Sequence, residues 1–129
     1  MAQNLRLIVT SGTREKLQMA AMITAVAAAG GTEVSVFVSM NALLYFRRAN
    51  TTEPGSEGDV GKILAAKKAP SFLDLFRQAV ELGSVRIYPC SMAMDVLAVG
   101  SADLVAYMEA PMGLTKFLSE FDDSHVLTF

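Results

Sequence analysis

The stretch LRLIVTSGT, residues 5–13, decides the class of fold. Residues 5–10 are mostly aliphatic and predict a short strand. The small residues 11–13 follow, and residues of this kind favour the start of a helix. The apolar residues after them predict a helix as far as residue 29, where Gly30 and Gly31 end it. A strand that leads straight into a helix indicates an α/β protein.

The same alternation continues along the chain. Further strands are predicted over residues 33–39, 84–88, 104–108 and 125–129, and helices over residues 41–47, 71–82, 92–99 and 114–121. The pattern Ser71-x-x-Asp74 resembles a capping box at the start of one helix. Strands that alternate with helices are expected to be parallel, with helices on both faces of the sheet. We therefore expect a three-layer α/β/α domain of the flavodoxin-like topology class, with a five-stranded, mainly parallel sheet.

The composition fits one folded domain over residues 1–129. Apolar residues make up 52% of the chain, which excludes disorder for most of it and leaves apolar surface for a homo-oligomer. Residues 48–70 are rich in glycine and charge, and this segment is too long for an ordinary connection. It is predicted to be a mobile flap, with a helical turn at residues 60–68.

Charge and cysteine content exclude several classes of protein. The chain has 11 Lys and Arg against 13 Asp and Glu, so it lacks the basic surface of a nucleic-acid binder. A single cysteine cannot form an internal disulfide. The longest apolar run, residues 19–29, spans about 16 Å as a helix and is too short for a membrane. No targeting segment is recognisable, so a cytoplasmic location without membrane contact is expected.

Ligands of open parallel sheets bind beyond the carboxyl ends of the strands. The residues predicted at that edge are therefore the candidate site residues: Gly12, Thr13, Met40, Asn41, Cys90, Ser91, Met92, Pro111 and Met112.

Cys90 is the candidate that carries chemistry. It follows a predicted strand and begins a predicted helix, and a helix start stabilises a thiolate and makes the sulfur more nucleophilic. From the residues alone, the alternative is a small buried hydrophobic residue. Gly12 could cradle an anion through backbone N–H groups, but a single glycine is a weak signal, and a tight turn with a cap is the preferred interpretation. The methionines either line a sulfur-bearing ligand or fill gaps in the core.

Other catalytic arrangements are not expected. His125 begins the last predicted strand, at the edge opposite Cys90, so a Cys–His hydrolase is not indicated. Cys90, Met92 and Met94 alternate at a spacing that does not bring three metal ligands together on a helix. Neither a dinucleotide fingerprint nor a P-loop occurs, and we expect neither a metal nor a cofactor.

The sequence resembles the DsrE/DsrF-like family of small sulfur-relay proteins. The resemblance is carried by LIVTSGT (7–13), VSVFVS (34–39), VRIYPCSMAMD (85–95), LTKFL (114–118) and VLTF (126–129). It implies a homo-oligomeric α/β/α domain in which Cys90 accepts sulfane sulfur as a persulfide and passes it on. The partners that it implies are TusA-like sulfur carriers and rhodanese-like proteins.

The sequence supports two functions. In the first, the protein is a sulfurtransferase or sulfur carrier, and a reachable Cys90 thiolate exchanges sulfur between proteins, because the chain has no second cysteine. In the second, an oligomeric α/β module binds a small anion or a protein at the same edge, and Cys90 is inert.

Overall fold

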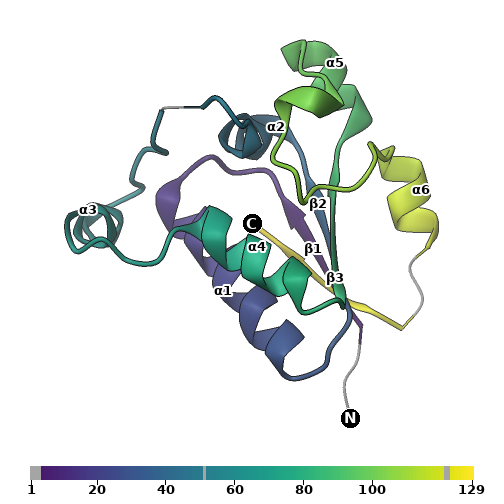
Figure 1. Cartoon of the computed structure of the whole chain (residues 1–129), viewed down its shortest axis with the longest axis horizontal. Helices are drawn as coiled ribbons and strands as arrows, with labels where there is room; N and C mark the ends of the chain where they lie inside the picture. Colours follow the sequence, from purple (N-terminus) through teal and green to yellow (C-terminus); the bar gives the residue numbers. More distant parts are fainter. Residues whose placement is uncertain (1–3, 51, 121–122) are drawn as a thin grey trace.

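The computed structural model describes residues 4–50, 52–120 and 123–129. Within them, four parallel strands form one sheet in the order β3-β2-β1-β4 (Figure 1). The strands are β1 (Leu5–Val9), β2 (Val34–Val38), β3 (Val85–Pro89) and β4 (His125–Thr128). The predicted parallel sheet is therefore confirmed, with one strand fewer than expected.

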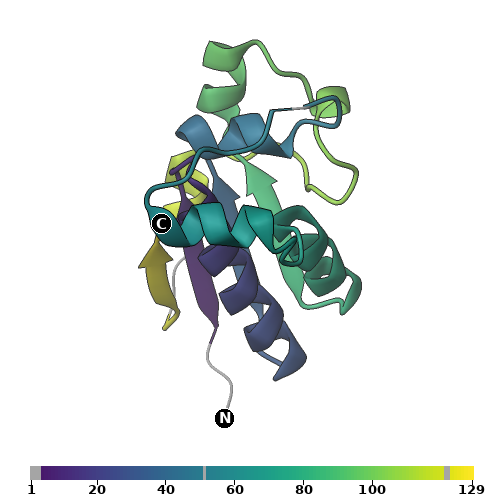
Figure 2. The same ribbon diagram turned by 90° about the vertical axis from the view of Figure 1, so that its left-hand side faces the viewer.

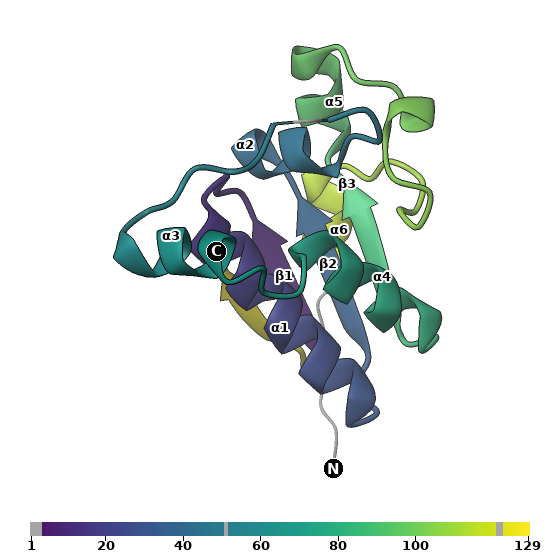
Figure 3. The ribbon, with the colours of Figure 1, turned by 60° about the vertical axis from the view of Figure 1, so that its left-hand side comes forward.

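Helices cover both faces of this sheet. α1 (Arg14–Ala29) and α4 (Phe72–Glu81) pack side by side on one face, and the short α6 (Leu114–Ser119) lies on the other (Figures 1 and 3). This arrangement confirms the three-layer α/β/α prediction.

Side-chain alternation along the strands assigns residues to the two faces. Phe37 of β2 stacks on Phe117 of α6, with ring centroids 5.0 Å apart. Leu7, Val36 and Ile87 lie in register with one another, point the opposite way to Phe37 and are fully buried. They consequently form the core beneath α1 and α4.

α4 shows how the local sequence starts a helix. The hydroxyl oxygen of Ser71 accepts a hydrogen bond from the N–H of Leu73 (3.2 Å) and caps the helix. The carboxylate of Asp74, which the capping-box pattern assigns to the cap, instead pairs with Arg77 (3.6 Å). Phe72, Phe76 and Ala79, spaced at i, i+4 and i+7, are the buried residues of the helix.

Shorter helices lie beyond the carboxyl ends of the strands (Figure 2). The predicted helix over residues 41–47 is divided into α2 (Met40–Leu43) and a 3₁₀ turn, η1 (Leu44–Phe46). After β3 comes α5 (Ser91–Leu97), which stops because Ala98 takes a left-handed conformation (φ 54°), and then η2 (Ser101–Asp103).

The predicted strand over residues 104–108 is wrong. Leu104 forms only an isolated antiparallel bridge with Arg47, and the N–H of Val105 donates to the carbonyl of Phe46 (2.9 Å). The chain then turns, because the N–H of Met108 donates back to the carbonyl of Val105 (3.2 Å). The N–H groups of Leu104, Val105 and Met108 thus donate to carbonyls outside the sheet.

Tyr107 in the same stretch anchors it to α4. Its phenol donates a hydrogen bond to the carbonyl of Leu73 (3.0 Å). Burial raises the pKa of Tyr107, and the nearby charge of Asp74 raises that pKa further, so the phenol keeps the proton that it donates.

The predicted flap, residues 48–70, contains α3 (Asp59–Ala66), close to the expected helical turn, and α3 lies beside α1. Residue 51 of this segment, and the predicted helix end at residue 121, lie outside the described residues. None of the helices that the structure describes is both long enough and apolar enough to cross a bilayer.

Candidate functional site

Cys90 lies at the carboxyl edge of the sheet, between the end of β3 and the start of α5. Its N–H donates to the carbonyl of Val38, the last residue of β2 (2.9 Å). Its backbone is extended (φ −69°, ψ 121°), and its Sγ accepts a hydrogen bond from the N–H of Ala93 at 3.5 Å. The thiol therefore caps the first turn of α5.

Residues 112 and 113 run alongside this cap. The N–H of Ser91 donates to the carbonyl of Met112 (3.1 Å), and the N–H of Met112 donates to the carbonyl of Pro89 (3.0 Å). A methyl group placed on Gly113 would lie 3.8 Å from the hydroxyl oxygen of Ser91. The structure thus brings Cys90, Ser91 and Met112 together.

The sulfur is covered in this conformation. Cys90 is 4% exposed and Met112 is 8% exposed. A reachable thiol is the expectation from sequence, and the packing of the strand ends around residue 90 overturns it for this conformation. Contact between the sulfur and a partner protein requires the surrounding chain to move.

Met40, Met92 and Pro111 form exposed surface. Met40 follows β2 in a left-handed conformation (φ 52°) and is 50% exposed, and Met92 in α5 is 55% exposed. Both methionines follow strand ends, so they present apolar side chains to solvent at the edge that holds Cys90.

Gly12 and Asn41 lie together, but around a packed turn. A methyl group on Gly12 would lie 2.8 Å from Cε2 of Tyr45 and 3.2 Å from Cβ of Asn41. These distances are shorter than ordinary van der Waals contact, so a larger residue at position 12 would force the ring of Tyr45, which lies over the turn, to move. The structure therefore fits the prediction of a tight turn at Gly12 better than that of an open anion cradle.

Thr13 faces the 48–70 segment. Its hydroxyl donates to the carboxylate of Glu57 (3.3 Å), and its backbone forms an isolated parallel bridge with Gly55. Sequence reasoning missed this contact because the two residues that bind Thr13 are more than forty positions away along the chain.

Glu15 is the main anchor of the same segment. Its carboxylate accepts hydrogen bonds from the N–H groups of Glu57 (2.8 Å), Gly58 (2.7 Å) and Gly61 (3.1 Å). These bonds, led by the one from Glu57, hold the pKa of Glu15 below its usual value. The carboxylate thus binds the start of α3, in addition to lying in the first turn of its own helix.

Acid is expected to release this anchor. The folded pKa of Glu15 is lowered from 4.5, so its stabilising contribution is complete above about pH 4.5 and is lost as the pH falls through the lower, folded value. The amide chemical shifts of Gly58 and Gly61, followed by NMR, should titrate with a midpoint below 4.5. Glu15→Gln should abolish that transition. A midpoint at or above 4.5 would show that the three bonds do not favour the ionised carboxylate.

Neither His125 nor a metal site accompanies Cys90 among the described residues. His125 is exposed at the start of β4, and the start of a parallel strand lies at the edge opposite Cys90. Asp95 is exposed on α5. The described residues contain no group of three His, Cys, Asp or Glu side chains that could hold a metal ion.

Cavities that Cys90 does not line lie elsewhere on the molecule. One of about 560 Å³ is lined by Arg47 and Arg48, together with the end of α5 and η2. Another of about 320 Å³ is lined by Arg14, Lys68 and Ser71. Cys90 lines neither cavity. No local sequence motif marks the cationic residues of these cavities. Arg14 and Lys68 are far apart in the sequence, and Arg47 and Arg48 follow a short helix.

Comparison with known proteins gives one family match and two similar folds. Residues 51–129 match the DsrE/DsrF/DrsH-like family. No curated protein matches the sequence. The crystal structure of the ychN protein from E. coli is similar over 98% of this chain and 99% of that chain, with a TM-score of 0.62 and 16% identity. A protein of unknown function, MTH1491 from Methanobacterium thermoautotrophicum, is similar over 95% of this chain and 99% of that chain, with a TM-score of 0.50 and 13% identity. At these identities the two structures support the fold alone.

Proposed function

The chain belongs to the DsrE/DsrF/DrsH-like family, and from that premise we propose that it relays sulfane sulfur, carried as a persulfide on Cys90. The observation that carries the proposal is the position of this cysteine, the only one in the chain, as the cap of α5 at the ligand-binding edge of the sheet.

The proposed chemistry is thiol exchange without net oxidation. The Cys90 thiolate attacks the outer sulfur of a donor persulfide, R–S–S⁻. A new S–S bond forms on Cys90, the S–S bond of the donor breaks, and the donor leaves as R–S⁻. An acceptor thiolate then attacks the outer sulfur of Cys90–S–S⁻ and regenerates the Cys90 thiolate. Because each step exchanges one thiolate for another, neither a metal nor a redox cofactor takes part.

Groups beside the thiol suit an anionic persulfide. The N–H of Ala93 already donates to Sγ, and the Ser91 hydroxyl lies on the same first turn of α5. Hydrogen-bond donors of this kind favour the charged form of a group that accepts from them. Met112 of the neighbouring loop is buried and pairs with Cys90 through its backbone, so we propose that this loop moves for sulfur to arrive.

Local opening of the surrounding chain exposes the sulfur to small sulfur donors, and a bound partner protein stabilises that opened form. Met40 and Met92 are half exposed at this edge and offer adaptable apolar contact to another protein. We therefore infer that a TusA-like carrier or a rhodanese-like protein docks there in the cytoplasm, against a homo-oligomer of this chain, and displaces the 112–113 loop. Gly12, Thr13, Asn41 and Pro111 would form the outer border of that docking area.

Mass spectrometry tests the proposal directly. After incubation of the intact protein with a polysulfide donor, we expect one added sulfur, about 32 Da, on the wild-type chain and none on Cys90→Ala. Later addition of an acceptor thiol should remove that mass. The control is Met94→Leu, which keeps volume in a buried position of the same helix and should load normally. A native chain that stays unmodified while the urea-unfolded chain loads would refute the relay.

One observation favours a second function. Because Cys90 is 4% exposed, its sulfur resembles a small core residue, as expected for a non-catalytic oligomeric module that binds a small anion or a protein. The rate at which iodoacetamide alkylates the native chain separates the two functions. Alkylation only as fast as global unfolding supports the module, and faster alkylation supports the relay.

A further inference from the structure

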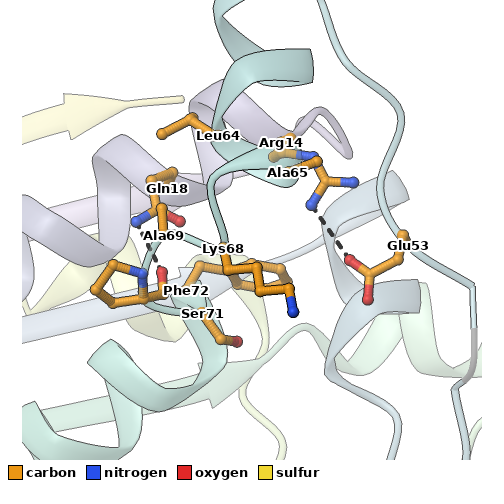
Figure 4. Close-up of a pocket in the computed structure, with 10 residues that line it drawn as sticks. Arg14, Gln18, Glu53, Leu64, Ala65, Lys68, Ala69, Ser71 and Phe72 are labelled. Atoms are coloured by element: carbon orange, nitrogen blue, oxygen red, sulfur yellow. Dashed lines mark hydrogen bonds and ion pairs between the residues drawn. The ribbon is translucent and has the colours of Figure 1, made fainter.

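The cavity of about 320 Å³ lies between the first turn of α1, the end of α3 and the start of α4 (Figure 4). Its volume is at the lower end of the range for small-molecule sites, roughly 300–1,000 Å³. Cys90 does not line it, so a ligand bound in this cavity does not depend on the sulfur relay.

Arg14 is the central polar group of the cavity. Its side chain is only 18% exposed. One terminal nitrogen donates to Glu53 (3.2 Å) and the other to the carbonyl of Pro54 (3.0 Å). Its Nε is buried and has no hydrogen-bonding partner among the described residues. A buried, charged N–H without an acceptor is costly, so the guanidinium has unused capacity for an oxyanion.

Glu53 shows what kind of group Arg14 binds. Its carboxylate reaches Arg14 through one oxygen, and its side chain is 78% exposed. An ion pair this exposed is worth little, because water and salt screen it. The chain therefore places a weakly held carboxylate of its own where a tighter-binding carboxylate from a ligand can replace it.

Two further donors line the cavity. Lys68 follows the end of α3 and forms no ion pair with any of the described residues. Its ammonium extends toward the side of the cavity with Arg14 and Glu53 (Figure 4). Ser71 accepts from Leu73 with its oxygen, which leaves its hydroxyl hydrogen free to donate. Two cationic side chains, Arg14 and Lys68, thus line the cavity together with one carboxylate, that of Glu53.

The remaining walls are mostly apolar and include Leu64, Ala65 and Phe72, and the amide of Gln18, which also lines the cavity, donates to the carbonyl of Pro70 (3.0 Å). We propose that this cavity binds a small organic carboxylate, whose oxygens take the place of Glu53 on Arg14 and also contact Lys68. The short apolar body of the ligand lies against Leu64 and Phe72. A carboxylate shared by an arginine and a lysine forms charge-assisted hydrogen bonds that Glu53 alone does not match.

NMR titration of the full chain with benzoate tests this proposal. We expect the amide signals of Arg14, Lys68 and Ser71 to shift, and the neutral analogue benzamide to bind more weakly. Glu53→Gln removes the internal competitor and should tighten benzoate binding by about two- to five-fold, the strength of an exposed ion pair. Such a gain cannot result from misfolding.

Matched variants complete the test. Lys68→Met should weaken benzoate binding by about two- to five-fold, while Lys67→Met, which changes a neighbouring exposed lysine outside the cavity, should leave it unchanged. Glu81→Gln, an acidic side chain at the other end of α4, controls for net charge. Equal affinity for benzoate and benzamide, or equal affinities in Glu53→Gln and Glu81→Gln, would overturn the proposal.

Discussion

Phe117→Ala is expected to lower the free energy of unfolding by about 3–5 kcal/mol, the usual cost of removing a fully buried aromatic ring. Phe117 is 0% exposed and is the buried residue of α6. Its ring stacks on Phe37 at 5.0 Å, and the guanidinium of Arg6 lies 5.7 Å from its centroid. A six-residue helix has little stability of its own, so α6 depends on this contact to stay on the sheet.

The same variant should also expose Cys90. The 112–113 loop, whose Met112 pairs with the backbone of Cys90, leads directly into α6, so loss of the Phe117 anchor should loosen that loop. Urea unfolding measures the stability change, and the iodoacetamide alkylation rate under native conditions measures the exposure. Leu118→Ala is the control, because Leu118 is 44% exposed on the same helix and its truncation should cost under about 0.5 kcal/mol. If both variants lose equal stability, Phe117 is not the anchor.

The strands were predictable where hydrophobicity alone determines them. Residues 34–38 are almost continuously apolar because helices cover both faces of the sheet, and that pattern is visible without coordinates. Residues 104–108 carry a similar pattern, but Leu104 is a buried residue of a loop. A buried loop and a buried strand differ only in where their N–H groups donate. Here the acceptor is Phe46, nearly sixty positions away, and no local rule identifies it.

The topology of the sheet predicts which residues of the candidate site lie together, but it does not predict the contacts that they make. The rule that strand ends share one edge correctly groups Cys90 with Ser91 and Met112, even though the strand expected before Met112 does not exist. Met112 reaches Cys90 because its N–H donates to the carbonyl of Pro89. The thiol is buried by tertiary packing, so a sequence that correctly predicts the helix start at Cys90 still gives no measure of how exposed the sulfur is.

The residues proposed for sulfur relay and those proposed to bind a carboxylate lie on separate parts of the molecule. Cys90 depends on the packing of α6 and the 112–113 loop, whereas the Arg14 cavity depends on how the 48–70 segment is fastened to α1. Changes at Phe117 should therefore alter alkylation without altering benzoate binding. Changes at Glu15, which anchors α3, should alter benzoate binding without altering the alkylation of Cys90.

Gly61→Ala is expected to detach the start of α3 from α1. A methyl group at this position would overlap the carboxylate of Glu15, with Cβ within 2.7 Å of both of its oxygens. Glu15 is flexible and would swing away, but it would then lose the three N–H donors that it accepts from residues 57, 58 and 61. We expect hydrogen exchange of those amides to accelerate about ten-fold or more, because local opening of the segment no longer breaks these bonds.

Gly55→Ala is the matched control for this variant. Gly55 lies in the same segment, and no atom lies within 4 Å of the methyl group that it would gain. Its exchange rates should stay close to those of the wild type, which separates the lost Glu15 contact from a general effect of adding a methyl group. The double variant Glu15→Gln/Gly61→Ala should add little to Gly61→Ala alone, because both changes remove the same three hydrogen bonds. Additive effects would mean that the overlap is relieved by movement of α3 itself, and that Glu15 is not what fastens the segment.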